Sequence, residues 1–273
     1  MWCSFHHGGC FYIEGGGQSL SDAFVDVIES HGSKVRRRNE VVAINTNNNG
    51  AVTGVETKRG KQFYAPQVLS NASAPLTFNH LLDRPELATK DAQTADRLPI
   101  SMSVSQSYVG IRGDASTLGL ADRGRFVEVD YDHEAQWKAM LEGDYRNQSH
   151  IIANHNLADP GHAPTGRSIL HSTLLTNGEP WMDLDRKTYR EKKREIEAYL
   201  VDRLEDAIPD VRERIEILET GTPHTMRRYT QNPGGAIYGY SSHVDSHSIH
   251  RPPTQTSVPG LYLSSAWPFP APG

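Results

Sequence analysis

Glycine is the residue type whose spacing in this sequence first suggests a binding site. Gly15, Gly16 and Gly17 stand in a row before a segment with helical periodicity, where backbone N–H groups can bind phosphate. A dinucleotide site requires the pattern G-x-G-x-x-G between a strand and a helix. The residues after Gly17 break this pattern, and no strand of that kind precedes the glycines. The glycine run therefore does not predict a complete phosphate site.

Histidine is abundant, with 13 copies, and raises the question of a metal centre. His243 and His247 have a spacing that suits a metal ion only on a helix, and the residues around them are typical of a loop. Cys3 and Cys10 have neither metal nor redox spacing. No G-x-S-x-G sequence is present to expose a nucleophilic serine. We therefore predict no metal site, no Ser-His-Asp hydrolase and no identifiable catalytic residue.

Composition limits the classes of protein to consider. The 273 residues are 37% hydrophobic and 22% charged, which is ordinary for a globular chain. The net charge of −5 argues against nucleic acid as a partner. No apolar run approaches the roughly 20 residues that cross a bilayer, and the first residues lack a signal core. These observations predict a cytoplasmic protein.

The first third of the chain alternates between helical and extended patterns. Leu20, Phe24, Val27 and Ile28 fall on one face of a helix, which predicts a helix over residues 19–31. The sequence Asn-Asn-Asn-Gly at residues 47–50 is typical of a hairpin turn. Extended segments are predicted around it, at residues 34–38, 40–44, 52–57, 62–64 and 67–69.

In the remaining two thirds, the predicted type of secondary structure changes twice. Residues 81–98 predict short helices or a connection. Strand-like segments at 103–110, 126–131, 149–156 and 168–175, separated by turn residues, then predict an antiparallel sheet. A long amphipathic helix is predicted over 183–208, ended by Pro209, with a strand at 215–218. The tail from Gly221 shows little periodicity.

The order of motifs along the chain is more specific than any single motif. After the glycine run come Gly50-Ala51-Val52-Thr53-Gly54-Val55, Val68-Leu69-Ser70-Asn71-Ala72, Thr222-Pro223-His224-Thr225, Arg228-Tyr229-Thr230, Tyr238-Gly239 and Gly260-Leu261-Tyr262-Leu263. This order resembles the flavin-dependent phytoene desaturase, carotenoid isomerase and retinol saturase family. The resemblance implies an α/β, two-lobe fold of the FAD-dependent amine oxidase or phytoene desaturase type. Residues 1–80 and 236–273 would form an incomplete, truncated flavin domain, and residues 81–235 a mixed-sheet substrate domain.

The resemblance also implies roles for residues near the cofactor. Val41 occupies the position whose backbone lies against the adenine, although packing explains most valines in strands. Asn71 and Ala72 belong to the small-residue end of a strand that passes near the cofactor, and an ordinary strand-to-loop transition is the alternative. Ser265 stands where relatives place a glycine beside the pyrophosphate, followed by Ala266 and Trp267 in the same closing segment.

A substrate contact is implied for one loop. Tyr238 and Gly239 resemble the loop that faces the flavin ring and the substrate passage, and a glycine-rich turn with a half-buried aromatic is the alternative.

The implied function is that of part of an FAD-dependent oxidoreductase that desaturates, saturates or isomerises a carotenoid or retinoid-like polyene. Because G-x-G-x-x-G is missing from the sequence, we expect the chain alone to bind FAD weakly or not at all, and to be inactive. Three alternatives stay open: a non-catalytic lipid-binding or interaction module, the partner subunit of a split flavoenzyme, and a flavin amine oxidase with a polar substrate. The expected partners are an apolar small molecule, a missing N-terminal half or flavin subunit, and the surface of a membrane.

Overall fold

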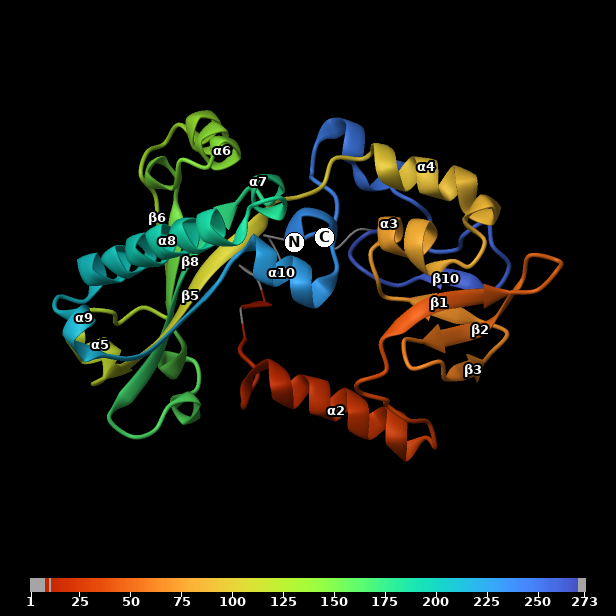
Figure 1. The fold of residues 1–273 in the computed structure, drawn as a ribbon. Helices are drawn as coiled ribbons and strands as arrows, with labels where there is room; N and C mark the ends of the chain where they lie inside the picture. The colour runs from red at the N-terminus through yellow and green to blue at the C-terminus, as the bar shows by residue number, and fades with distance from the viewer. Residues whose placement is uncertain (1–7, 10, 270–273) are drawn as a thin grey trace. The chain divides into compact units, whose positions relative to one another are not determined.

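The structure is a computed structural model that describes residues 8–9 and 11–269, so Cys3, Cys10 and residues 270–273 lie outside the described residues. Its helices are α2 (Gly16–Ser30), α3 (Ala74–Leu76), α4 (Thr89–Arg97), α5 (Ala115–Leu118), α6 (His133–Glu142), α7 (Glu179–Met182), α8 (Arg186–Ala207), α9 (Val211–Arg214) and α10 (Pro223–Thr230). Its strands are β1 (Val41–Thr46), β2 (Val52–Thr57), β3 (Gln62–Tyr64), β4 (Val68–Ser70), β5 (Ser103–Arg112), β6 (Gly124–Val127), β7 (His150–Asn154), β8 (Arg167–Thr176), β9 (Ile215–Gly221) and β10 (Leu261–Leu263). Figure 1 labels them along the chain.

The chain divides into two compact units, and each is built from two separate stretches of sequence. The first unit consists of Met1–Val35 and Val104–Thr222, and the second of Arg36–Ser103 and Pro223–Gly273. These units divide the chain after residues 35, 103 and 222, whereas the prediction divided it after residues 80 and 235. Ala88, Ala95 and Leu98 are buried in the core of the second unit. Which unit holds a cofactor and which holds a substrate stays a prediction.

The second unit contains a small antiparallel sheet in the order β1-β2-β3, visible in Figure 1. The turn between β1 and β2 is held by the Asn47 side chain, whose Oδ1 accepts the N–H groups of Asn49 and Ala51. Side-chain oxygens of Asn often stabilise turns in this way. The hairpin predicted from the Asn-Gly step is therefore confirmed, as are the predicted bounds of β2 and β3.

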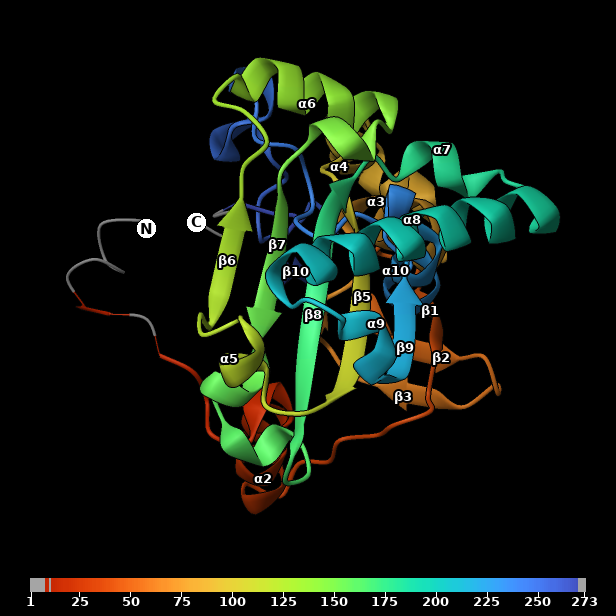
Figure 2. The ribbon, with the colours of Figure 1, turned by 90° about the vertical axis from the view of Figure 1, so that its left-hand side faces the viewer.

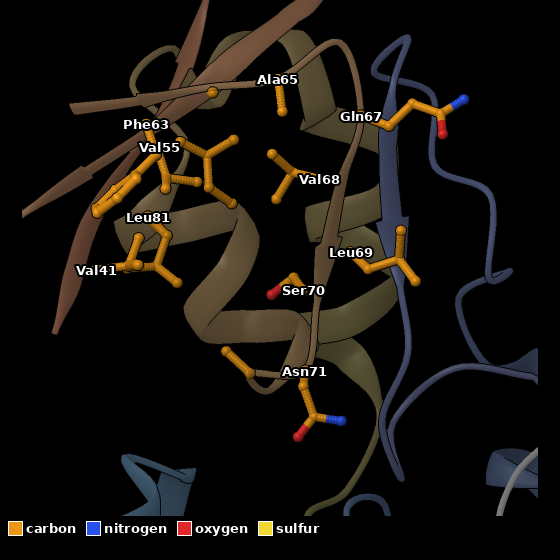
Figure 3. Close-up of a pocket in the computed structure, with 13 residues that line it drawn as sticks. Val41, Val55, Phe63, Ala65, Gln67, Val68, Leu69, Ser70, Asn71 and Leu81 are labelled. Carbon is orange, nitrogen blue, oxygen red and sulfur yellow. The ribbon is translucent and has the colours of Figure 1, made fainter. Parts of the chain in front are cut away.

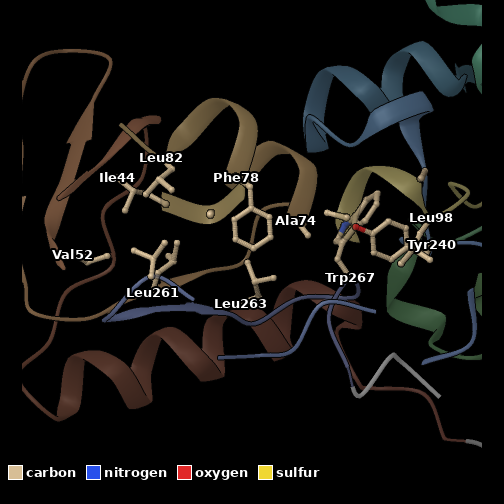
Figure 4. Packing of buried hydrophobic residues seen from close by; sticks show 14 residues of the cluster. Ile44, Val52, Ala74, Phe78, Leu82, Leu98, Tyr240, Leu261, Leu263 and Trp267 are labelled. Carbon is tan, nitrogen blue, oxygen red and sulfur yellow. The ribbon is translucent and has the colours of Figure 1, made fainter. Parts of the chain in front are cut away.

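A parallel strand pair and short helices complete the second unit. β4 and β10 pair in parallel although nearly 200 positions of sequence separate them, with Leu263 opposite Ser70. Figure 4 shows the apolar core around them, in which Leu261, Phe78 and Ile44 are almost fully buried. This core joins the two sequence stretches of the unit through burial of apolar side chains.

The first unit is organised around a five-stranded sheet in the order β6-β7-β8-β5-β9, shown in Figure 2 with α8 lying across one face. The pairs β6–β7, β7–β8 and β5–β9 are antiparallel, as the strand-and-turn pattern predicts. A mixed sheet, which the family resemblance implied for this region, would also contain parallel pairs, and these three pairs are not parallel. Leu170 and Leu174 of β8 point to the buried side, where Leu200 and Leu204 of α8 are also buried. Alternate residues of β8 are only half-buried, which leaves the other face of the sheet partly open.

Two predicted strands differ from those observed, and one observed helix was not predicted. No strand forms at residues 34–38, where Arg38 has a left-handed φ of 58° that interrupts an extended segment. β6 ends at Val127, before the highly exposed Tyr131. The helix α10 was not predicted, because Met226 and Tyr229 alone are too few large apolar residues to define a helical face.

Helix α2 confirms the predicted helix but begins three residues earlier than expected. Its apolar residues Leu20, Phe24, Val27 and Ile28 are all exposed, and no residue of the helix is buried. Among the described residues, no helix is long and apolar enough to cross a membrane.

Candidate functional site

The second unit contains an apolar pocket of about 450 Å³ between its small sheet and β4. Figure 3 shows the side chains that line it. They are Val41, Ile44, Gly54, Val55, Phe63, Ala65, Gln67, Val68, Leu69, Ser70, Asn71, Ala72 and Leu81. The pocket brings together three residues that the sequence predicted near the cofactor, namely Val41, Asn71 and Ala72. It has the size and the mainly apolar lining that are typical of small-molecule sites.

Strand β1 gives the pocket an open edge. It is one of the two edge strands of its sheet, and the exposed fraction of Val41 is 36%. Backbone N–H and C=O groups on such an edge can pair with a flat heterocycle. Gly54 forms another part of the wall at a φ of 147°, where a Cβ atom would lie 2.0 Å from the carbonyl oxygen of Phe63. An isolated glycine in a strand marks a close backbone approach of this kind, so the sequence carried a signal for Gly54.

Two cations lie beside the pocket at Phe63. The guanidinium of Arg36 is 5.2 Å from the Phe63 ring centroid, and the ammonium of Lys61 is 5.1 Å from it. Both cations lie close to an apolar wall, where they would attract an anionic ligand group such as a phosphate. The prediction from sequence missed them, because single charges in strands and turns are common on surfaces.

The carboxyl ends of β4 and β10 meet at one side of the pocket. The Asn71 side-chain amide donates a hydrogen bond to the carbonyl oxygen of Ser264, and Ser264 N donates to the carbonyl oxygen of Ser70 at 2.8 Å. Ser70 Oγ also shares a hydrogen bond of 2.7 Å with Thr77 Oγ1. Ligands of α/β proteins bind at the carboxyl ends of parallel strands, so this junction is the expected place for one.

The closing segment runs on from this junction, but its predicted residues do not line the pocket. Trp267 is almost fully buried, with its ring centroid 4.8 Å from that of Tyr240 in the apolar core. Its side chain is therefore part of the core, and only its backbone is available for a ligand. Ser265 and Ala266 are half-buried, and Ser265 Oγ accepts the N–H of Trp267 at 3.4 Å.

A buried arginine holds the closing segment to the loop that carries Tyr238. Arg251 is 8% exposed and donates to the carbonyl oxygens of Tyr240 at 3.1 Å and Ala266 at 3.3 Å. Burial lowers the pKa of Arg251. This role could not be predicted from the sequence, because an arginine before two prolines is typical of exposed loops.

The predicted substrate loop lies against the closing segment and outside the pocket. Tyr238 is 58% exposed, and its N–H donates to Ser101 Oγ at 3.2 Å. Gly239 has a φ of 79°, and a Cβ atom there would lie 2.8 Å from the carbonyl oxygen of Ala266. Glycine is therefore required at this contact for steric reasons, and the substrate role of both residues stays a prediction.

The histidines that suggested a metal lie on separate short turns. His243 precedes the 3₁₀ turn Val244–Ser246, and His247 follows it, so the two do not share a helical face. Within residues 8–9 and 11–269, no three His, Cys, Asp or Glu residues gather with the geometry of a metal site.

Comparison with known proteins places the chain in a family. The sequence profile of flavin-containing amine oxidoreductases matches residues 2–268. Prolycopene isomerase from Daucus carota is 27% identical over 99% of this chain and 43% of its own length, and all-trans-retinol 13,14-reductase from Danio rerio is 26% identical over 94% and 46%. The chain thus spans less than half the length of these curated relatives.

A solved structure supports the fold. An oxidoreductase from Methanosarcina mazei superposes with a TM-score of 0.57 at 18% identity, over 92% of this chain and 49% of its own. The implied α/β flavoprotein fold and the resemblance to enzymes of carotenoids and retinoids are confirmed. The chain belongs to the flavin-containing amine oxidoreductase family.

Proposed function

We propose that this chain is part of an FAD-dependent oxidoreductase that acts on a carotenoid or retinoid-like polyene. The observation that carries the proposal is the match of residues 2–268 to a flavin family, together with relatives named for prolycopene and retinol. FAD would supply the redox chemistry by taking or giving a hydride. The protein would hold the cofactor and the apolar substrate.

The residues of the second unit fit the adenosine half of FAD. The open edge of β1 at Val41 and the apolar wall that includes Val55 and Val68 suit a flat heterocycle. Arg36 and Lys61 lie where they would favour the adjoining phosphates. Asn71 and the backbone of Ser265 would lie at the strand ends that face the cofactor.

A second candidate is the partner subunit of a split flavoenzyme. It is favoured by α2, whose apolar residues are exposed although they fall on one helical face. Helices of soluble proteins usually bury such a face. The expected partner is a polypeptide that carries the dinucleotide fingerprint missing from these 273 residues.

The test is a titration of the purified chain with FAD, followed by flavin fluorescence and by the visible absorption spectrum after desalting. We expect binding too weak to survive desalting, and competition by AMP because the pocket suits the adenosine half. Ala72→Trp should fill the pocket and weaken binding by about tenfold, equivalent to 1.4 kcal/mol. Tyr64→Ala is the matched control, since Tyr64 is 79% exposed and does not line the pocket. Equal binding by wild type and Ala72→Trp would contradict this site.

A further inference from the structure

The first unit contains a second pocket, of about 550 Å³, on the half-open face of its sheet. Tyr108 of β5 and Ile169 of β8 form the part that belongs to the sheet, and Phe11, Tyr12 and Ile13 form the opposite wall. None of the site residues predicted from sequence lines it. The pocket is thus mainly aromatic and aliphatic, and its volume suits a medium-sized organic molecule.

Two histidines give this pocket a polar end. His155 and His162 line it from the 3₁₀ turns His155–Leu157 and Pro160–His162, with their ring centroids 6.1 Å apart. His155 Nε2 shares a hydrogen bond of 2.7 Å with Nδ1 of His171, which lies on β8 behind it. Among the described residues, no hydrogen-bond partner contacts Nδ1 of His155.

Two of the histidines at this end, His155 and His171, favour the uncharged form. Burial, followed by the neighbouring histidine, lowers the pKa of both His155 and His171, that of His171 to about 4. The nearby carboxylate of Asp159 is engaged by the N–H groups of Gly15 at 2.8 Å and Gly161 at 2.8 Å. These bonds also fix the start of α2 beside His162. The pocket therefore offers an apolar body and an uncharged hydrogen-bonding group.

We propose that this pocket selects polyenes that end in a hydroxyl or carbonyl group, and that His155 is the residue that recognises this group. The polyene class rests on the proposed function, whereas the selection for a polar end rests on the pocket alone. A hydroxyl both donates and accepts, so it satisfies His155 in either tautomer. A pure hydrocarbon would leave the imidazole nitrogen desolvated and unpaired, and a site built for a hydroxyl rejects the analogue that lacks it.

The experiment compares two ligands that differ in one group. The purified chain is titrated with all-trans-retinol and with the hydrocarbon that lacks the hydroxyl, and binding is followed by ligand fluorescence. We expect retinol to bind at least about tenfold more tightly. His155→Leu should bring the two affinities close to equality, and His155→Asn should restore part of the preference. The exposed His133 supplies a control variant, His133→Leu, that should keep the full preference.

One further variant assigns the preference to a pocket. Ala72→Trp, in the pocket of the second unit, should leave the retinol preference unchanged, which assigns the preference to the first unit. The wild-type ratio tests the proposal even if a His155 variant fails to fold. Equal wild-type affinities, or no binding of either ligand, would overturn it. A retinol preference without any flavin binding would keep this inference and remove the proposed function, whereas flavin binding with equal affinities would do the reverse.

Discussion

At the scale of single residues, the half-buried His155–His171 pair makes stability depend on pH. The pKa of His171 is about 4 in the folded chain, below its ordinary value of 6.5. Between these values the unfolded chain takes up a proton that the folded chain does not. The free energy of unfolding should therefore fall as the pH is lowered from 6.5 to about 4, and its His171 contribution should be constant above that window.

This prediction is measured as the thermal midpoint at a series of pH values. Between pH 6.5 and 4, the thermal midpoint of His171→Asn should fall by several degrees less than that of wild type, because the variant lacks the titrating group. His133→Asn alters an exposed histidine and should leave the slope as it is. A wild-type slope retained in His171→Asn would show that other groups cause the acid sensitivity.

The family resemblance pointed to residues of one pocket, and nothing in the sequence indicated the other, for a physical reason. Val41, Asn71 and Ala72 were placed by the resemblance, and the fold brings them to one pocket. His155 and His171 were not identified, because 16 positions separate them and only the pairing of β7 with β8 brings the turn after β7 next to β8. Spacing along a sequence indicates contacts within one helix or hairpin, but not contacts of this kind.

At the scale of elements, the predicted strands were most accurate where turn chemistry set their limits. β2 and β3 have their predicted bounds because the turns at Asn47–Gly50 and Arg59–Gly60 leave no freedom for the strand ends. α8 was also predicted, over residues 183–208, and it begins at Arg186 after the N-cap residue Asp185. α10 and the domain division were not predictable from local patterns, because packing against distant residues decides them.

The β2–β3 hairpin lines the pocket, and its Gly54 allows a prediction about both stability and binding. Gly54→Ala would place a Cβ atom 2.0 Å from the carbonyl oxygen of Phe63, so either the hairpin register or the strand must shift. We expect it to lower the free energy of unfolding by about 3 kcal/mol or more. It should also abolish any FAD binding. Urea denaturation measures the first effect, and the fluorescence titration measures the second.

Gly60→Ala separates this collision from backbone strain. Gly60 also has a positive φ, of 74°, but a Cβ atom there would meet open space. Its cost should be about 1 kcal/mol, with FAD binding unchanged. Equal losses in the two variants would mean that strain alone, and not contact with Phe63, requires glycine at residue 54.

At the scale of the whole molecule, the larger stretch of the first unit, Val104–Thr222, is inserted between the two stretches of the second. Gln106 lies opposite Gly221 in the β5–β9 pairing, so the two ends of this inserted stretch are neighbours in space. The insert, Val104–Thr222, contains the five-stranded sheet and α8 with their own buried clusters. A compact unit with its own core and adjacent ends meets the conditions for independent folding.

We therefore predict that residues 104–222 fold when they are produced alone. The fragment should show a cooperative urea transition and a far-UV spectrum of mixed helix and sheet.

Joining Ser103 to Pro223 through a short glycine-serine linker should give a second folded protein that retains the FAD affinity of the whole chain, since its pocket is complete within one unit. The two halves also separate the ligand sites, because the spliced protein lacks His155 and should bind retinol no better than the hydrocarbon. If the 104–222 fragment is unfolded while the spliced protein folds, the sheet depends on contacts from outside residues 104–222. The first candidates for these contacts are α2 and the segment before it.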